Sequence, residues 1–110
     1  MVFLSTRNTT KTVDLSIISK LNKAFESRVR LGIMSLLIIN DWLDYKYLKE
    51  KLELTDGNLA SHINALEKLE YIVVKKAFIG KKTNTSYQIT ELGKQAFSEH
   101  LKALEQIIKS

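Results

Sequence analysis

Short polar side chains gather on one side of the stretch LTDGNLASHINALEKLEY, residues 54–71. At about 100° per residue, its apolar residues fall within one narrow arc, Leu59, Ile63 and Leu66, with Leu69 at the edge. The opposite side carries Gly57, Ser61, Asn64 and Lys68, flanked by Asn58 and Ala65. A solvated helix face is ordinarily filled by long Lys and Glu side chains, so short residues here favour a partner that approaches closely. Because Asn can pair bidentately with adenine and Ser can donate or accept, this face suits base edges in a DNA major groove.

The start of this helix is marked by Thr55 and Asp56. The Thr55 hydroxyl is placed to accept a hydrogen bond from a free amide of the first turn, and the Asp56 carboxylate suits the positive end of the helix dipole. We therefore expect a single amphipathic helix whose outer face reads DNA. A solvated polar face with no partner is the alternative that this stretch alone leaves open.

The side chains that catalysis or metal binding would need are sparse. The chain has no Cys, and its two His, His62 and His100, give no metal-ligand spacing. His62 lies at the boundary of the helical wheel, which favours a phosphate contact or a packed His over catalysis. Asp41 and Asp44 flank Trp42 and are explained as turn and cap residues. We therefore expect no enzyme activity, no cofactor and no metal site.

Length and charge describe a small basic domain. The 110 residues, 45% of them hydrophobic, form one domain able to bury a single core. Seventeen Lys and Arg against 12 Asp and Glu give a net charge of +5, which favours a polyanionic partner but is a weak indication alone. The longest aliphatic run, residues 36–39, is far too short to cross a bilayer, and the apolar start is too short for a signal peptide. We expect a cytoplasmic protein with no membrane partner.

Two helices are predicted in the first part of the chain. Residues 1–12 show no periodicity and are expected to form a flexible N-terminal arm. Asp14 then caps a helix that ends near Glu26. Ser27 caps a second helix, residues 28–40, which is apolar nearly all round and is therefore the buried centre of the domain.

A third helix, residues 45–52, follows with Asp44 as its cap. Together with a brief turn and the helix within residues 54–71, it has the proportions of a helix-turn-helix. The second of the two helices is then the one that reads DNA.

After the reading helix the hydrophobic period changes to two, which predicts a β-hairpin. Its strands cover residues 72–78 and 85–89, and the loop between them, IGKKTN at residues 79–84, is longer than a tight turn. Four Lys and no acid lie between Lys75 and Lys82. Lys can protect an edge hairpin from aggregation. Beside a helix-turn-helix, the basic loop is better interpreted as a wing that lies along phosphates or over the minor groove.

The last helix runs from Glu91 to about Lys109, with Thr90 as its cap. An apolar seam of coiled-coil type steps along it by four, three and four residues: Phe97, Leu101, Leu104 and Ile108. At about 28 Å the helix is longer than a domain of this size can cover, and an exposed seam usually marks a partner surface. We expect a homodimer. The alternative is that the seam folds back on the first helix of the same chain.

The order of these elements resembles a winged helix-turn-helix domain, and three segments carry the resemblance: SRVRLGIMSLL, LTDGNLASHINALEKLEYI and KKAFIGKKTNTSYQITELGKQAF. They look like the small bacterial and archaeal transcriptional regulators related to the MarR and ArsR groups, over roughly residues 21–104. The resemblance implies a mainly α fold with a β-hairpin, five helices and a wing sheet of two or three strands. We divide the chain into the arm, a DNA-binding domain of residues 13–89 and a dimerisation helix of residues 90–110.

The resemblance also assigns residues to the DNA surface. The positions that approach the major groove in the family are Asp56, Gly57, Asn58, Ser61, His62 and Asn64, and those on the wing are Lys81, Lys82 and Thr83. The sequence departs from the family at Glu70, where Gly commonly ends the recognition helix, so a different helix end or a strained backbone is expected. The wing lacks the Pro often seen in relatives. Without a Cys pair, metal sensing by thiolates is disfavoured.

We therefore predict a homodimeric regulator that binds specific sequences of double-stranded DNA. The DNA-binding residues are Thr55, Asp56, Gly57, Asn58, Ser61, His62, Asn64, Lys68, Lys81, Lys82 and Thr83. The two copies of the recognition helix should meet half-sites about one helical turn apart, roughly 34 Å. A protein-interaction module without sequence-specific DNA binding is the alternative. A small-molecule effector also stays open, because Trp42, Tyr45 and Tyr47 could line a pocket, although core packing explains them better.

Overall fold

The computed structural model describes residues 15–109, so the expected arm and the Asp14 cap lie outside the described residues. These residues form, in chain order, α1 (Leu15–Ile18), the 3-10 helix η2 (Lys23–Phe25), α2 (Arg28–Ile38), β1 (Leu43–Asp44), α3 (Tyr45–Lys51), α4 (Asp56–Lys68), β2 (Ile72–Ile79), β3 (Lys82–Ile89) and α5 (Glu91–Lys109). The expected fold, mainly helical with a small antiparallel sheet, is confirmed, and the sheet has three strands.

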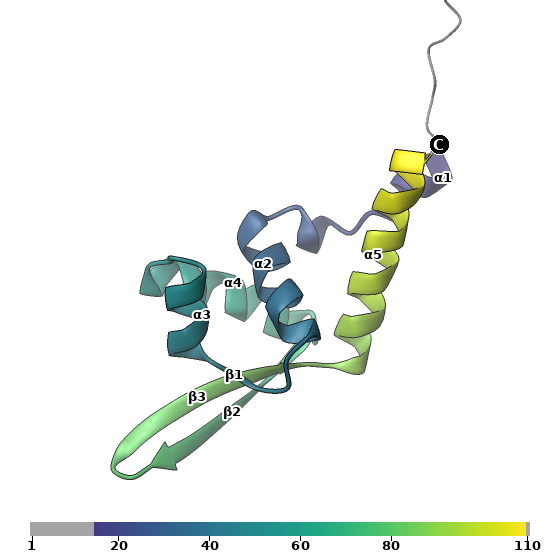
Figure 1. The fold of residues 1–110 in the computed structure, drawn as a ribbon. Coiled ribbons are helices and arrows are strands. Elements are labelled where there is room, and N and C mark those ends of the chain that lie inside the picture. Colours follow the sequence, from purple (N-terminus) through teal and green to yellow (C-terminus); the bar gives the residue numbers. More distant parts are fainter. Residues whose placement is uncertain (1–14, 110) are drawn as a thin grey trace, which may run out of the picture.

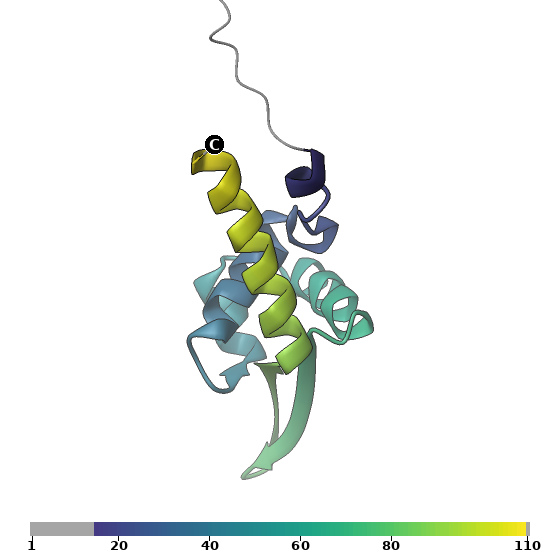
Figure 2. The ribbon, with the colours of Figure 1, turned by 90° about the vertical axis from the view of Figure 1, so that its right-hand side faces the viewer.

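Helices α2, α3 and α4 lie together over the base of the hairpin, while α5 stands along one side of the domain (Figures 1 and 2). The distal part of the hairpin projects away from the helices in both views. The C-terminal half of α5 extends beyond α2, α3 and α4, and α1 packs beside it. Among residues 15–109, the hairpin and the end of α5 with α1 beside it therefore reach furthest from the core.

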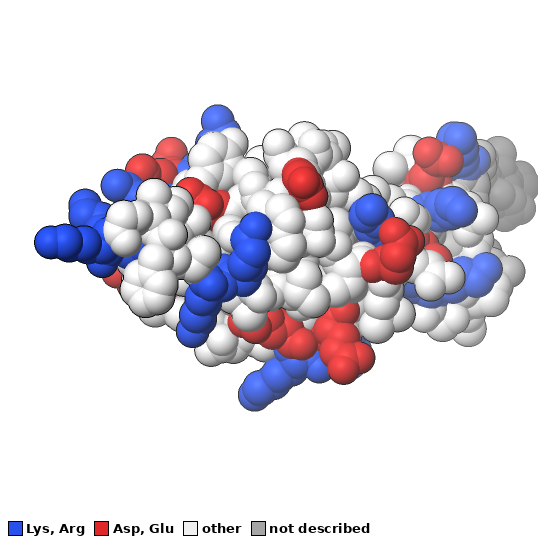
Figure 3. All heavy atoms as spheres, turned by 90° about the horizontal axis from the view of Figure 1, so that it is seen from below, with Lys and Arg blue, Asp and Glu red and all other residues white. Residues whose placement is uncertain are grey.

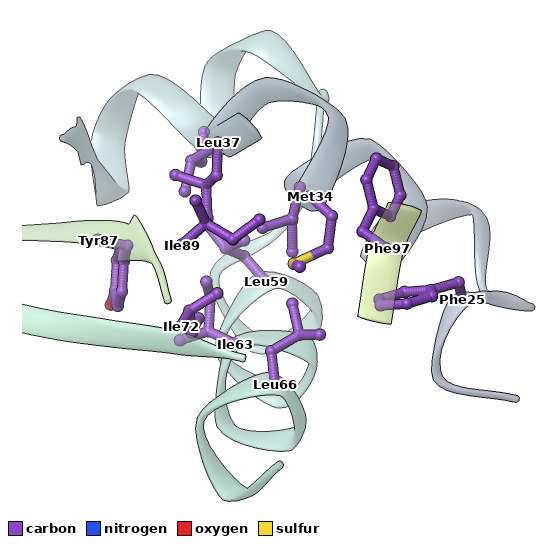
Figure 4. Packing of buried hydrophobic residues seen from close by; sticks show 12 residues of the cluster. Phe25, Met34, Leu37, Leu59, Ile63, Leu66, Ile72, Tyr87, Ile89 and Phe97 are labelled. Carbon is purple, nitrogen blue, oxygen red and sulfur yellow. The ribbon is translucent and has the colours of Figure 1, made fainter. Parts of the chain in front are cut away.

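Helix α2 lies at the centre of the core. Its Ile33, Met34 and Leu37 are fully buried, which explains why the sequence of this helix is apolar nearly all round. They pack in one cluster with residues of α4 and of the sheet, among them Leu59, Ile63, Leu66, Ile72, Tyr87 and Ile89 (Figure 4). Burial raises the pKa of the Tyr87 hydroxyl to about 12, so this core tyrosine stays neutral at ordinary pH.

The sheet has the strand order β1-β3-β2, with both pairs antiparallel. Strands β2 and β3 stay in register from Ile72 opposite Ile89 to Ile79 opposite Lys82. Only Gly80 and Lys81 remain to make the turn, and Gly80 has the left-handed φ of 66° that glycine adopts without strain. The expected loop of residues 79–84 is therefore wrong. Its polar residues Lys82 to Asn84 form the distal end of β3, where no side chain is buried, and so they carry no hydrophobic alternation that would have marked the strand.

The expected first helix, from Asp14 to Glu26, is also wrong. Helix α1 ends at Ile18, and a separate 3-10 turn begins at Lys23. The Asn22 side chain accepts a hydrogen bond from the amide of Ala24 at 2.9 Å, while the Asn22 amide donates to Nδ1 of His100 at 2.9 Å. These contacts replace the helical hydrogen bonds of this segment, because Asn competes with the backbone for local partners.

The expected caps are confirmed at three helices. The hydroxyls of Ser27, Thr55 and Thr90 each accept a hydrogen bond from the amide three residues on, at 3.3, 3.2 and 2.9 Å. Asp44 occupies the N-cap position of α3 but its side chain makes no cap hydrogen bond. Glu70 has a left-handed φ of 64°, which confirms the strained helix end expected where the family has Gly.

Candidate nucleic-acid interface

Helix α4 divides into a buried and an exposed side as the wheel predicted. Leu59, Ile63 and Leu66 are at most 2% exposed. The exposed residues of the helix include most of the predicted contacts, namely Asp56, Gly57, Asn58, Ser61, Asn64 and Lys68, with the cap Thr55 exposed beside them. Because the buried residues anchor the helix in the core, this polar side is held facing outward by packing rather than by helix propensity alone.

Asp56 is held at the start of α4 by two residues of α3. Its carboxylate lies 3.0 Å from Nζ of Lys49, and its carbonyl oxygen accepts a hydrogen bond from the Tyr45 hydroxyl at 3.0 Å. Burial, and then the charge of Asp56, raise the pKa of Tyr45. These contacts join α3 to the start of α4, the two helices of the helix-turn-helix. The exposed ion pair also offsets the negative charge that Asp56 would otherwise present to DNA phosphates.

His62, predicted to face the groove, is half-buried beside Arg30 of α2. Nη1 of Arg30 lies 3.0 Å from Nδ1 of His62, and Nε of Arg30 donates to the carbonyl of Ala24 at 2.6 Å. Arg has no acceptor, so Nδ1 of His62 must accept and the ring proton sits on Nε2. Burial, and then the Arg30 charge, lower the pKa of His62. His62 is therefore a neutral side chain with a single ring N–H donor.

The wing is formed by the end of the β2-β3 hairpin. Lys76, Lys81, Lys82 and Thr83 are exposed there. Seen from the hairpin side of the molecule, Lys and Arg side chains gather at the end where the wing lies (Figure 3). Lys75 differs from the other three lysines because its Nζ lies 4.3 Å from the centre of the Trp42 ring, a cation–π contact within the chain.

The residues of the predicted α5 seam lie in two different environments. Phe97 is 2% exposed and meets Phe25 edge to face at 5.3 Å between ring centres, so it belongs to the core of its own chain. Leu101, Leu104 and Ile108 remain 44%, 37% and 82% exposed. The start of the seam therefore folds back on the segment before α2. The rest is only partly covered, with α1 packed beside α5 and Ile108 almost fully exposed.

Two contacts of this interface were missed by sequence reasoning. The Arg30–His62 pair joins residues on two helices, and the Lys75–Trp42 pair joins a strand to a loop. Helical and strand periodicity report only which face of one element is buried, so neither pair had a local signal. The aromatic pocket weighed for Trp42, Tyr45 and Tyr47 has a different arrangement, since Trp42 underlies Lys75 and Tyr45 bonds to Asp56.

Within residues 15–109 no group of three or more His, Cys, Asp or Glu side chains is arranged to hold a metal ion. In the same part of the chain, no helix is long and apolar enough to cross a membrane.

Comparison with known proteins identifies the fold and the family. The uncharacterized protein MJ0432 of Methanocaldococcus jannaschii is 39% identical over 88 residues, which are 80% of this chain and 96% of that protein. The solved structure of a transcriptional regulator homologue from Pyrococcus horikoshii OT3 has a TM-score of 0.76 at 29% identity and covers 86% of this chain and 92% of its own. The YusO protein from Bacillus subtilis has the same fold, with a TM-score of 0.69 at 16% identity and coverage of 86% and 70%.

Residues 29–108 match the family model described as a winged helix DNA-binding domain. This range runs from α2 through the recognition helix and the wing into α5, so it contains the whole candidate interface. The resemblance to winged helix-turn-helix proteins is thereby confirmed. The chain belongs to the family of winged helix DNA-binding domains.

Proposed function

We propose that this transcriptional regulator binds specific sequences of double-stranded DNA as a homodimer, with α4 in the major groove and the wing on the backbone or minor groove. The observation that carries the proposal is the exposed side of α4, which is built from Gly, Ser and Asn and fixed outward by a fully buried opposite side. Short polar side chains let base edges approach and offer the donors and acceptors that distinguish them. A surface for docking protein would instead carry aromatic or aliphatic anchors.

The wing and α4 have different roles in the proposed DNA binding. Lys81 and Lys82 are exposed and have no ion-pair partner among the described residues, so their charges are available to phosphates. Phosphate contacts supply affinity that is independent of sequence, and contacts from α4 supply the discrimination. His62, with its single N–H donor, supports a hydrogen bond to a phosphate or base acceptor at the edge of the same surface.

The partly exposed end of the α5 seam supports the dimer. Leu101, Leu104 and Ile108 recur at coiled-coil spacing on a helix that extends beyond the compact domain. A second copy of the same seam would cover these side chains and hold two recognition helices at a fixed separation. A protein that binds chromosomal DNA in a bacterium or archaeon works in the cytoplasm, and we place this chain there.

The test combines a binding assay with a mass measurement. Fluorescence anisotropy with a labelled random-sequence duplex across a salt series should show affinity that falls linearly on a log–log scale. Selection from a random pool should then yield one preferred site, and light scattering should give the mass of a dimer. A protein that binds no duplex even at low salt is instead an interaction module that uses the same fold.

A further inference from the structure

The tip of the wing carries two large apolar side chains with no cover. Phe78 is 76% exposed and Ile79 is 66% exposed, and they are neighbours immediately before the Gly80 turn. Single exposed apolar residues are common on soluble proteins, but here two consecutive strand residues leave both faces of the hairpin end apolar and exposed, which calls for a partner that surrounds the tip. Neither phosphate binding by the lysines nor base reading by α4 accounts for these two residues.

The geometry of the sheet holds this pair away from the domain. Strand β1 pairs only with Ser86 and Tyr87 of β3, so the part of the hairpin from Lys76 and Thr85 to the turn has no third strand. This two-stranded part is four residues long on each side and spans about 13 Å at roughly 3.3 Å per residue. Because its turn has only two residues, the tip is no wider than two strands, and Figures 1 and 2 show it projecting.

The charge around the pair indicates what it meets. Residues 72–89 contain four Lys and no Asp or Glu. Lys82 is the cross-strand partner of Ile79, and Lys76 lies two residues before Phe78 on the same face of the strand. In DNA, stacked apolar bases lie between two strands of charged phosphates. An apolar tip flanked by lysines matches this arrangement, with the tip facing the bases and the lysines facing the phosphates.

Resting on the proposed function, we propose that Phe78 is an apolar wedge that the wing inserts between base pairs from the minor groove. Ile79 packs against the sugar wall, and Lys76, Lys81 and Lys82 hold the phosphates on either side. Insertion of an apolar side chain partly unstacks one base step and kinks the duplex toward the major groove. The wing then contributes preference for deformable pyrimidine–purine steps, without any hydrogen bond to a base.

The experiment uses the full chain and a duplex selected from a random pool. Dyes at the two ends report bending by energy transfer, and 2-aminopurine placed at successive positions under the wing reports unstacking. The variant Phe78→Ser removes the wedge from an exposed site and so leaves the fold intact. Val73→Ser is the matched control, because Val73 is a 43% exposed apolar residue at the base of the same strand.

The wild-type chain should kink the duplex by about 20° or more and brighten 2-aminopurine at one step. Phe78→Ser should bind the same duplex about tenfold more weakly, with the same salt slope, a straight duplex and no brightening. Val73→Ser should match the wild type. Equal bending by the wild type and Phe78→Ser would overturn the wedge and leave DNA binding intact, whereas failure of both to bind any duplex would overturn the proposed function as well.

A membrane surface is the other polyanion with an apolar layer. Sedimentation with vesicles containing phosphatidylserine separates the two, since the wedge predicts no dependence of vesicle binding on Phe78. Vesicle binding that needs Phe78, combined with an unbent duplex, would overturn the proposal.

Discussion

The hydroxyl of Thr90 donates a 2.7 Å hydrogen bond to the carbonyl oxygen of Glu70, so the segment just after α4 is bonded to the residue that caps α5. The Thr90 amide also donates to the Tyr71 carbonyl at 3.0 Å, and the Thr90 hydroxyl accepts from the Gly93 amide at 2.9 Å. These bonds stabilise the left-handed Glu70 backbone. They also tie the segment after α4 to the start of α5, so the candidate DNA surface and the proposed dimer helix are joined by direct hydrogen bonds.

Gly93 lets the first turn of α5 pack closely against the backbone of Tyr71. A Cβ at this position would lie 2.2 Å from the Tyr71 carbonyl oxygen and 3.0 Å from Cγ1 of Ile89. Gly93→Ala should therefore lower the free energy of unfolding by about 1–3 kcal/mol or more, because the backbone itself must move. Urea denaturation followed by circular dichroism measures the change. Gly57→Ala is the control, because its Cβ would meet nothing within 4 Å and should raise stability by up to about 1 kcal/mol. Equal effects of the two variants would contradict this account.

Glu70→Gly should stabilise the fold. The left-handed φ of 64° costs a side chain with a Cβ about 1–2 kcal/mol, and removal of the Cβ relieves this strain at a smaller entropic cost. We expect a gain of about 0.5–1 kcal/mol in the free energy of unfolding, measured by urea titration. Glu67→Gly, inside α4, should lower stability by about 1 kcal/mol. A loss of stability in both variants would show that the Glu70 backbone is not strained.

His62 should make stability depend on pH. Burial and the Arg30 charge lower its pKa in the folded state, so below about pH 6.5 the unfolded chain binds a proton that the folded chain resists. The contribution of neutral His62 to the free energy of unfolding is therefore fully present above about pH 6.5. It is lost as the pH falls through the lower pKa of the folded state. His62→Gln, which can still accept from Arg30, should flatten the decline in unfolding free energy between about pH 7 and pH 5. Ser61→Ala should keep the wild-type slope, and an unchanged slope in His62→Gln would refute the assignment.

The α5 seam should control the oligomeric state. Leu101→Glu places a charge on a side chain that is 44% exposed in the single chain, so the fold should survive while the paired seam is broken. Light scattering should then report a monomer of about half the wild-type mass. Gln95→Glu, on an exposed position nearer the start of the helix, should leave the mass unchanged. A wild-type protein that is already monomeric would remove the homodimer from the proposal.

The sequence predicted those parts of the fold that depend on interactions between residues close together in the chain. Helix α4 and its Thr55 cap were correct because both signals lie within one element. The first helix was wrong because Asn22 bonds to His100, 78 residues further on, which no local pattern reports. Strand β3 was placed too short because its exposed residues lack alternation. Glu70 was the one strained position that a local departure from the family marked in advance.

The candidate site divides in the same way. The outward face of α4 was predictable because period 3.6 fixes it relative to the buried Leu59, Ile63 and Leu66. The side chains that contact α4 from other helices could not be predicted. Lys49 pairs with Asp56 from α3, and Arg30 pairs with His62 from α2. Phe97 shows the same limit, since the seam predicted an outward position and packing against Phe25 placed it in the core.

The measurement that tests the central claim most directly compares two kinds of variant on two duplexes across a salt series. Lys81→Gln with Lys82→Gln should weaken binding to the selected and the random duplex alike, and should reduce the log–log salt slope by about two. Lys102→Gln with Lys109→Gln on α5 should leave the slope unchanged. Asn64→Ala should weaken binding to the selected duplex alone, by about 1–3 kcal/mol, with the salt slope unchanged. Equal losses on both duplexes for Asn64→Ala would contradict the claim that α4 reads the sequence.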